Sequence, residues 1–303
     1  MYRECLLAVA SRSAVRRFVL RHAALLGVDR FVGGSSVAAA VAVARRLNRQ
    51  GVGATFDVLG EDVRDPEAAE RVRETYLALL DAAAAAGVDA HVSVKPSAVG
   101  AALSAATAYE HLERIVARAQ ARDTYVRLDM EHSALTDVTL ELFRALDDRF
   151  PGRVGTVLQA YLHRTPADLE RLSDRPRRFR IVKGAYREPP TVALRRRRDI
   201  ADAFWRLATG ALAAGHHVAV ATHDVALRER VLAWIRLRDC PRDRYEWQTL
   251  YGVGYAELLR LAWAGEPCRI YVPFGEDWYG YVVRRLAERP ENLALVLRAW
   301  VRG

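Results

Sequence analysis

The sequence contains 46 basic residues, of which only two are lysines, Lys95 and Lys183. Each of these lysines follows a short apolar run. A lysine ammonium is a mobile point charge, which differs from the planar, forked guanidinium of arginine. The two lysines are therefore candidate binding groups at the mouth of a fold, although a compositional bias toward arginine leaves a few lysines by chance.

A second candidate group lies near the end of the sequence, in WYGYVVRRLAERPEN. Tyr281, Arg284, Arg285 and Glu288 are spaced so that a helix presents a phenol, two guanidiniums and a carboxylate on one face. Adjacent guanidiniums suit a substrate carboxylate, and Glu288 can hold one of them in place. The same spacing fits a surface helix with an arginine–glutamate pair, so the periodicity alone leaves both interpretations open.

The surroundings of Lys183 allow two kinds of chemistry. In RIVKGAYREP, Gly184 and Ala185 let the backbone approach a flat ligand, which Tyr186 can cover. An amine at the end of a strand can instead form a Schiff base, as in barrel aldolases. The aldolase is the main alternative hypothesis.

Two other polar residues have more than one interpretation. Asp129, in VRLDMEHS, can orient Lys95 or Lys183, or it can cap the start of a helix. His223, in VATHD, is as consistent with a hydrogen-bonding histidine as with a catalytic base, because no second histidine or cysteine lies near it at a nucleophile spacing.

The elements that must position these residues follow a repeated pattern of a strand-like run and a helical segment, such as Pro66–Gly87 and Val225–Asp239. Eight runs are predicted as strands: Ala54–Leu59, Asp89–Lys95, Thr124–Met130, Val154–Tyr161, Phe179–Gly184, His217–Thr222, Arg244–Leu250 and Arg269–Pro273. Eight such units predict a (βα)8 barrel of the TIM type. No Gly-x-Gly-x-x-Gly follows a strand, which disfavours a dinucleotide-binding sheet. We expect a single domain, with a helical segment over residues 1–50 and the barrel over residues 54–303.

In such barrels the chemistry lies at the carboxyl ends of the strands. The predicted strand ends carry many polar side chains: Asp57, Lys95, Asp129, Glu131, Gln159, Arg180, Lys183, Tyr186, Thr222, His223, Asp224, Gln248, Tyr251 and Tyr271. A buried strand has no structural use for such groups unless they pair or meet a ligand. The expected ligand is large, polar and anionic, and a flavin fits this description.

The composition excludes several other classes of protein. The chain has 303 residues, 51% of them hydrophobic, and a net charge of +9, so disordered and collagen-like classes are excluded. Three scattered cysteines indicate neither a disulfide framework nor a zinc site. No apolar run is long enough to span a bilayer. The positive charge allows a nucleic-acid partner, but no basic patch with interleaved aromatic residues supports one.

The ordered motifs together resemble the flavin-dependent proline dehydrogenases in their monofunctional bacterial form, along most of the chain. The matching segments are TFD with LGE (from residues 55 and 59), VSVKPSAVG (92), RLDMEHSALTD (127), VLQAYLHRT (157), RIVKGAYREP (180), ATHD (221), EWQTLYG (246) and RIYVPFGEDWYGYVVRRLAERPENL (269). The resemblance implies a distorted (βα)8 barrel that holds FAD at its mouth and oxidises L-proline to 1-pyrroline-5-carboxylate.

The resemblance also implies a role for individual residues. Arg284, Arg285 and Lys95 would bind the proline carboxylate, with Glu288 fixing an arginine and Asp129 supporting Lys95. The ring would be enclosed by Tyr186, Leu250, Tyr271 and Tyr281. The positions that match FAD ligands are Gln159, Arg180, Val182, Lys183, Gly184, Ala185, Ala221, Thr222, His223, Gln248 and Arg285, with Arg180 near flavin N5.

Three residues depart from the family pattern without removing a charged ligand position. Arg187 replaces a neutral residue, Trp247 a phenylalanine and Phe274 a tyrosine, which we expect to affect pocket shape and FAD affinity. The resemblance implies a membrane quinone as electron acceptor and a separate 1-pyrroline-5-carboxylate dehydrogenase downstream. It also implies a cytoplasmic protein that can attach peripherally to the inner membrane.

Overall fold

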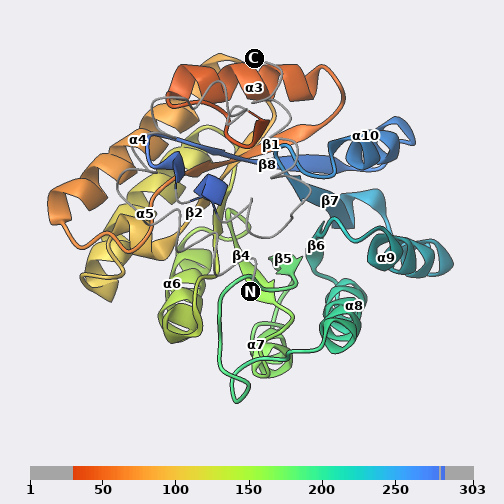
Figure 1. Cartoon of the computed structure of the whole chain (residues 1–303). Helices are drawn as coiled ribbons and strands as arrows, with labels where there is room; N and C mark the ends of the chain where they lie inside the picture. The colour runs from red at the N-terminus through yellow and green to blue at the C-terminus, as the bar shows by residue number, and fades with distance from the viewer. Residues whose placement is uncertain (1–29, 280, 284–303) are drawn as a thin grey trace, which may run out of the picture.

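The computed structural model describes residues 30–279 and 281–283. Eight parallel strands form a closed barrel in sequence order, and β8 pairs with β1 to complete it. The strands are β1 Gly53–Val58, β2 Ala90–Val94, β3 Val126–Leu128, β4 Val154–Gln159, β5 Arg178–Val182, β6 His217–Ala221, β7 Tyr245–Leu250 and β8 Cys268–Phe274. The (βα)8 barrel and all eight predicted strands are therefore confirmed (Figure 1).

Helices surround the strands. They are α3 Val37–Asn48, α4 Pro66–Ala85, α5 Ala105–Ala121, α6 Thr136–Arg149, α7 Thr165–Arg171, α8 Arg197–Ala213, α9 Val225–Leu237 and α10 Tyr255–Trp263, with short 3-10 turns η2 Pro96–Val99, η3 Ser133–Leu135 and η4 Arg242–Arg244. The predicted helices after residues 66 and 225 are both present. Asp65 caps α4, which starts with Pro66, and Gly87 follows its end with a φ of +61°. Within the described residues, every helix is too short or too polar to cross a lipid bilayer.

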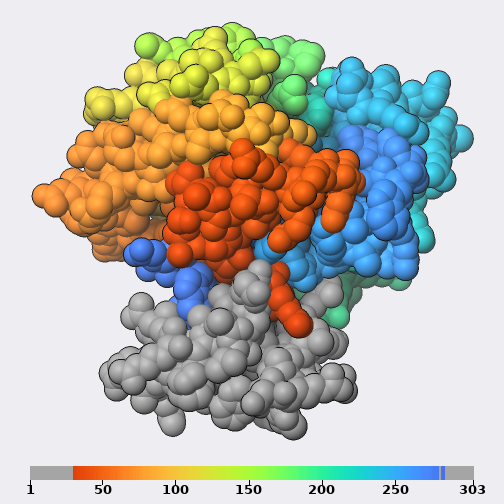
Figure 2. Space-filling view, turned by 90° about the horizontal axis from the view of Figure 1, so that it is seen from above, coloured from red at the N-terminus to blue at the C-terminus, as the bar shows by residue number. Residues whose placement is uncertain are grey.

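Helix α3 precedes the barrel in sequence but belongs to its outer layer. It packs on β1 and β8, where a helix following β8 covers the strands in a regular barrel. Arg46 donates to the Tyr251 hydroxyl, and the Tyr255 hydroxyl donates to Gln50. The carboxyl end of α3 and the turn after it are therefore tied to β7 and α10. Figure 2 shows the orange-red surface of α3 between those of α4 and α10.

The turn that leads into α3 ends in a helix cap. The Ser36 hydroxyl accepts a hydrogen bond from Ala39 N at 3.2 Å and caps the helix. Gly33 is required because a Cβ there would lie 2.5 Å from Val272 Cγ1, on the strand that α3 covers. Residues 1–29, the rest of the predicted helical segment, lie outside the described residues.

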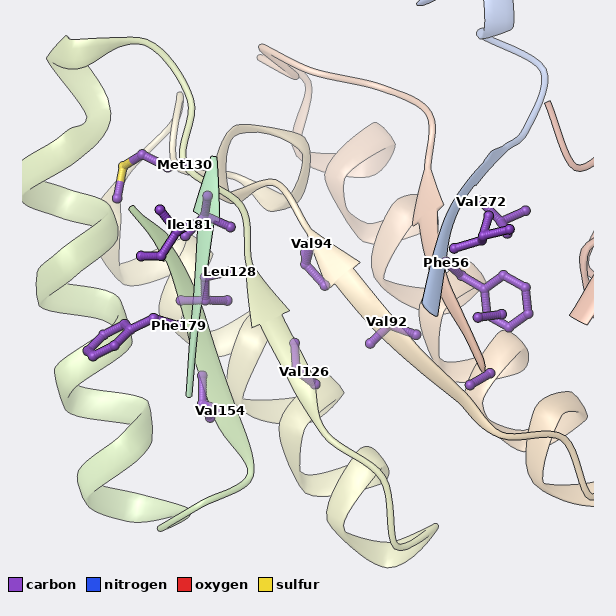
Figure 3. Close-up of a cluster of buried hydrophobic side chains, with 14 of the residues drawn as sticks. Phe56, Val92, Val94, Val126, Leu128, Met130, Val154, Phe179, Ile181 and Val272 are labelled. Carbon is purple, nitrogen blue, oxygen red and sulfur yellow. The ribbon is translucent and has the colours of Figure 1, made fainter. Parts of the chain in front are cut away.

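The strands separate an apolar layer from a polar interior. Side chains at alternate positions, including Phe56, Val92, Leu128 and Phe179 in Figure 3, pack against the helices in one hydrophobic cluster. The intervening side chains point into the barrel and are largely polar. Trp247 and Phe274 belong to the apolar layer, with Phe274 edge-to-face on Phe56. These two departures from the family pattern therefore shape the packing of the barrel wall.

Candidate active site at the mouth of the barrel

Lys95 and Asp57 form an ion pair at the mouth. Asp57 lies near the end of β1, and Lys95 follows the adjacent strand β2. Lys95 Nζ lies 2.6 Å from Asp57 Oδ1, and the lysine side chain is 13% exposed. Because an ammonium has three N–H donors, Lys95 can bind a further acceptor while Asp57 holds it in place.

The mouth is rich in carboxylates. Burial raises the pKa of Asp57 to about 6, an effect that the charge of Asp129 reinforces and Lys95 opposes. Burial also raises the pKa of Glu131, which accepts hydrogen bonds from the backbone N–H and hydroxyl of Ser97. Burial acts to lower the pKa of Lys95, but Asp57 and Asp129 outweigh it and the pKa is raised. The lysine is therefore charged at neutral pH.

Arg180 is the centre of a second polar group that crosses the barrel. From β5 its Nη1 reaches Asp129 Oδ1 at 2.8 Å and Ser93 Oγ at 3.1 Å, and its Nε reaches Gln248 Oε1 at 2.7 Å. The Tyr271 hydroxyl donates to Asp129 Oδ2 at 2.8 Å, and the Arg180 guanidinium lies 5.1 Å from the Tyr271 ring centroid. Arg180 is thus fixed by residues from four other strands or strand ends.

The structure gives Asp129 different partners from those expected. Its hydrogen bonds go to Arg180, Ser93 and Tyr271, whereas the salt-bridge partner of Lys95 is Asp57. Asp129 supports Lys95 only through its charge. It caps no helix either, because the next element, η3, begins after His132. The sequence did not indicate the direct partner of Asp129, because Arg180 reaches it from β5 across the barrel and this contact has no sequence signature.

Three buried polar atoms at this end of the barrel have no hydrogen-bond partner among the described residues. They are Asp57 Oδ2, Gln159 Oε1 and Arg180 Nη2. Gln159 is otherwise held by donating to the carbonyl oxygens of Met130 and Glu131. Unpaired buried polar atoms are costly, by about 1–3 kcal/mol each. Two acceptors and a guanidinium donor facing one mouth fit a polar, aromatic cofactor with both donor and acceptor edges, such as a flavin.

Lys183 lies at the end of β5 but is not in the environment of a Schiff-base lysine. Its Nζ lies 2.6 Å from Asp224 Oδ2, and 36% of its side chain is exposed. Asp224 is also the cap of α9, and its pKa is lowered chiefly by the hydrogen bond from Lys183. A nucleophilic lysine needs a desolvated, neutral amine. The structure therefore disfavours the aldolase hypothesis.

Gly184 is explained by contact with the protein itself. It has a φ of +112°, and a Cβ at this position would lie 2.2 Å from the ring of Tyr161. The glycine therefore lets β5 turn away above a buried tyrosine. We expected it to admit a flat ligand, and the Tyr161 contact is sufficient reason for a glycine here.

The loop that carries Tyr186 is fastened to the neighbouring loop after β3. Glu188, which is buried, accepts hydrogen bonds from Ser133 N and Ser133 Oγ, both at 2.6 Å. The Tyr186 ring lies edge-to-face with His132, with centroids 6.3 Å apart. These contacts hold the loop of Tyr186 against the loop that follows β3.

The remaining expected residues are distributed around the same end of the barrel. Leu250, at the end of β7, packs in one apolar cluster with Tyr281. The other positions expected to bind FAD lie at or just after the ends of β5 and β6: Val182, Ala185, Ala221, Thr222 and His223. Arg284, Arg285 and Glu288 lie outside the described residues.

Sequence analysis missed three residues of this site. Ser93 lies two positions before Lys95, and Glu246 lies two positions before Gln248. Because side chains two residues apart on a strand point to the same face, both could have been predicted to point into the barrel. Glu188 belongs to the RIVKGAYREP motif, but no role was predicted for it. A buried acid two residues after a candidate tyrosine is the signal that could have identified its contacts with Ser133.

Comparison with known proteins agrees with this geometry. A family model described as proline dehydrogenase matches residues 40–296. The chain belongs to the proline dehydrogenase family. It is 36% identical to proline dehydrogenase of Deinococcus radiodurans over 307 residues, covering 100% of this chain and 99% of that protein. It is 35% identical to proline dehydrogenase 1 of Bacillus subtilis strain 168 over 301 residues, covering 98% of each.

A solved proline utilization A from Bdellovibrio bacteriovorus, inactivated by N-propargylglycine, has the same fold. The TM-score is 0.80 at 24% identity, over 86% of this chain and 32% of that larger chain. The range matched by the proline dehydrogenase model contains every candidate site residue, including the three near residue 285 that the structure does not describe.

Proposed function

We propose that this chain oxidises L-proline to 1-pyrroline-5-carboxylate with FAD as its cofactor. The observation that carries the proposal is the near-complete match in length to bacterial proteins named proline dehydrogenase. The barrel mouth supports it, because one ammonium and one guanidinium are fixed there beside unpaired polar atoms.

The cofactor would be held along β4 to β7. Among the described residues, Gln159 Oε1 is an acceptor and Arg180 Nη2 a donor without a hydrogen-bond partner, and Gln248 fixes Arg180. Lys183, with Val182, Gly184, Ala185, Ala221, Thr222 and His223, would form the surrounding wall. When bound, FAD supplies a hydride acceptor at its N5 atom. Arg180 would supply a positive charge to the bound flavin.

The substrate would be bound by its carboxylate. Lys95 would be one cation for it, and Arg284 and Arg285 would be the others. The aromatic and aliphatic groups of Tyr186, Leu250, Tyr271 and Tyr281 would enclose the ring, exclude water and limit its size. Glu288 would orient an arginine. Asp129 would act by fixing Arg180 and Tyr271, the two groups that it contacts.

The proposal extends to the partners of the reaction. A two-electron oxidation requires an acceptor, for which we propose a membrane quinone. The cyclic imine product would pass to a separate 1-pyrroline-5-carboxylate dehydrogenase. We also propose that the enzyme is cytoplasmic and reaches the quinone at the inner membrane surface.

The visible spectrum of the purified chain tests the proposal. We expect flavin absorbance that bleaches on anaerobic addition of L-proline and persists with L-alanine. N-propargylglycine should abolish the activity in a time-dependent manner. A colourless protein that takes up no FAD would contradict the proposal. Borohydride trapping of a substrate adduct, lost in Lys183→Met, would instead establish the aldolase.

A further inference from the structure

A continuous chain of hydrogen bonds runs through the inside of the barrel, from the mouth to the opposite end. Beyond Arg180 it continues from Gln248 Nε2 to Glu246 Oε1, and Glu246 Oε2 accepts from Arg269 Nε at 3.0 Å. Arg269 Nη2 then reaches Asp89 Oδ1 at 3.0 Å. All members except Asp89 are buried. Glu246 and Gln248 are two residues apart on β7 and therefore share its inner face.

The groups on either side of Gln248 fix the orientation of its side-chain amide. The Arg180 guanidinium has only donors, and the Glu246 carboxylate has only acceptors. Gln248 must therefore turn its Oε1 toward Arg180 and its Nε2 toward Glu246. If the amide were turned over, an NH2 group would face the Arg180 Nε–H at 2.7 Å.

We propose that Glu246 is a positioning residue for the flavin, acting through Gln248 on Arg180. By accepting from Gln248 Nε2 it holds Gln248 Oε1 as the acceptor for Arg180 Nε. Arg180 Nη1 is meanwhile held by Asp129 and Ser93, which leaves Nη2 as the donor without a partner among the described residues. The inference rests on the proposed function, in which this guanidinium lies beside the flavin.

Glu246 can perform this role because it stays ionised inside the barrel. Burial acts to raise its pKa, but Arg269, followed by His217 and Arg127, outweighs burial and lowers the pKa to about 2. Arg269 also donates to Ala54 O at 2.8 Å, which anchors the lower end of the chain to β1. A carboxylate that faces two fixed donors has no alternative hydrogen-bond pattern.

Three variants of the full chain test the role. In Glu246→Gln the new amide has one acceptor and one donor, whereas both groups that face it, Arg269 Nε and Gln248 Nε2, are donors. One of the two contacts must therefore break. Arg269→Met leaves Glu246 and its bond to Gln248 in place but removes the partner of a buried charge. The double variant Glu246→Gln/Arg269→Met removes the competing donor, so the new amide can accept from Gln248 again.

The expected results separate positioning from stability. Glu246→Gln should lower kcat about tenfold to a hundredfold, make the flavin midpoint potential more negative and change the KM for proline little. Arg269→Met should lower Tm but keep the wild-type potential, because a Glu246 that takes up a proton still accepts from Gln248 Nε2 through its carbonyl oxygen. The double variant should recover most of the lost kcat and the potential. A crystal structure of the cofactor-free Glu246→Gln protein should show Gln248 or Arg180 displaced.

Two outcomes would overturn the inference. One is a wild-type potential and kcat in Glu246→Gln. The other is a loss of kcat that follows Tm equally in Glu246→Gln and Arg269→Met. A wild-type chain that binds no FAD would contradict the proposed function itself, while the crystal structure of the variant would still report whether Glu246 orients Gln248.

Discussion

The phenol of Tyr271 donates a hydrogen bond to Asp129 Oδ2 at 2.8 Å. Tyr271→Phe should therefore lower the free energy of unfolding by about 2 kcal/mol, the cost of a lost hydrogen bond to a charged group. It should also raise the KM for proline, because Asp129 and Arg180 lose one of their constraints. Urea unfolding and steady-state kinetics check both effects.

Tyr245→Phe is the matched control. The Tyr245 hydroxyl donates to Glu266 at 2.8 Å at the start of β7, away from the mouth. It should lose comparable stability and leave the KM unchanged. Equal changes of KM in the two variants would contradict the role of Tyr271.

Asp57 should make stability depend on pH between about 4 and 6. Its folded pKa is raised from 3.8 to about 6, so the native state binds a proton that the unfolded state has released in this range. The stabilisation is complete below about pH 4 and is lost as the pH rises through 6. Relative to Asp57→Asn, the wild type should lose about 3 kcal/mol of unfolding free energy. Parallel stability curves for the two proteins from pH 4 to 7 would refute this.

Gly184→Ala should destabilise the protein by about 1–3 kcal/mol, because an L side chain is strained at a φ of +112° and would collide with Tyr161. The displaced strand end should also reduce the FAD content. Gly210→Ala, in α8 with open space around its Cβ, should raise stability by about 0.5–1 kcal/mol. Thermal unfolding and flavin absorbance measure both; an unaffected Gly184→Ala protein would show that the turn has another conformation open to it.

Arg284→Met, Arg285→Met and Lys95→Met should each raise the KM for proline about tenfold to a hundredfold, as expected for the loss of a charge-assisted hydrogen bond. Their FAD content should change far less. Arg114→Met, an exposed residue paired with Glu110 on α5, controls for the loss of one positive charge. Equal loss of bound FAD in both arginine variants would rule out carboxylate binding as their main role.

The sequence was sufficient to predict the barrel because short strand-like runs alternate regularly with helical segments. Val154–Tyr161 and Thr124–Met130 were predicted too long, since β4 ends at Gln159 and β3 ends at Leu128. The candidate residues were identified by their types at the strand ends, where a polar side chain has few structural uses.

Pairing between those residues could not be predicted in the same way. Asp129 bonds to Arg180, two strands away around the barrel, and Lys95 bonds to Asp57. To predict which of three nearby carboxylates a cation contacts, one must know the curvature and tilt of the strands. The alternation of inward and outward side chains along a strand does not determine either. Lys95 was one of several partners that the sequence allowed for Asp129 and the one that the family resemblance implied, and the structure gives Asp129 a different direct partner.

Helix α3 and strand β1 are among the first described elements to be synthesised, yet both need β8, which is made near the end, to cover them. A growing chain on the ribosome therefore exposes an open sheet edge and the apolar face of α3 until translation is almost complete. Such a delay leaves time for association with other nascent chains. Expression at lower temperature or with a chaperone should accordingly increase the yield of folded protein.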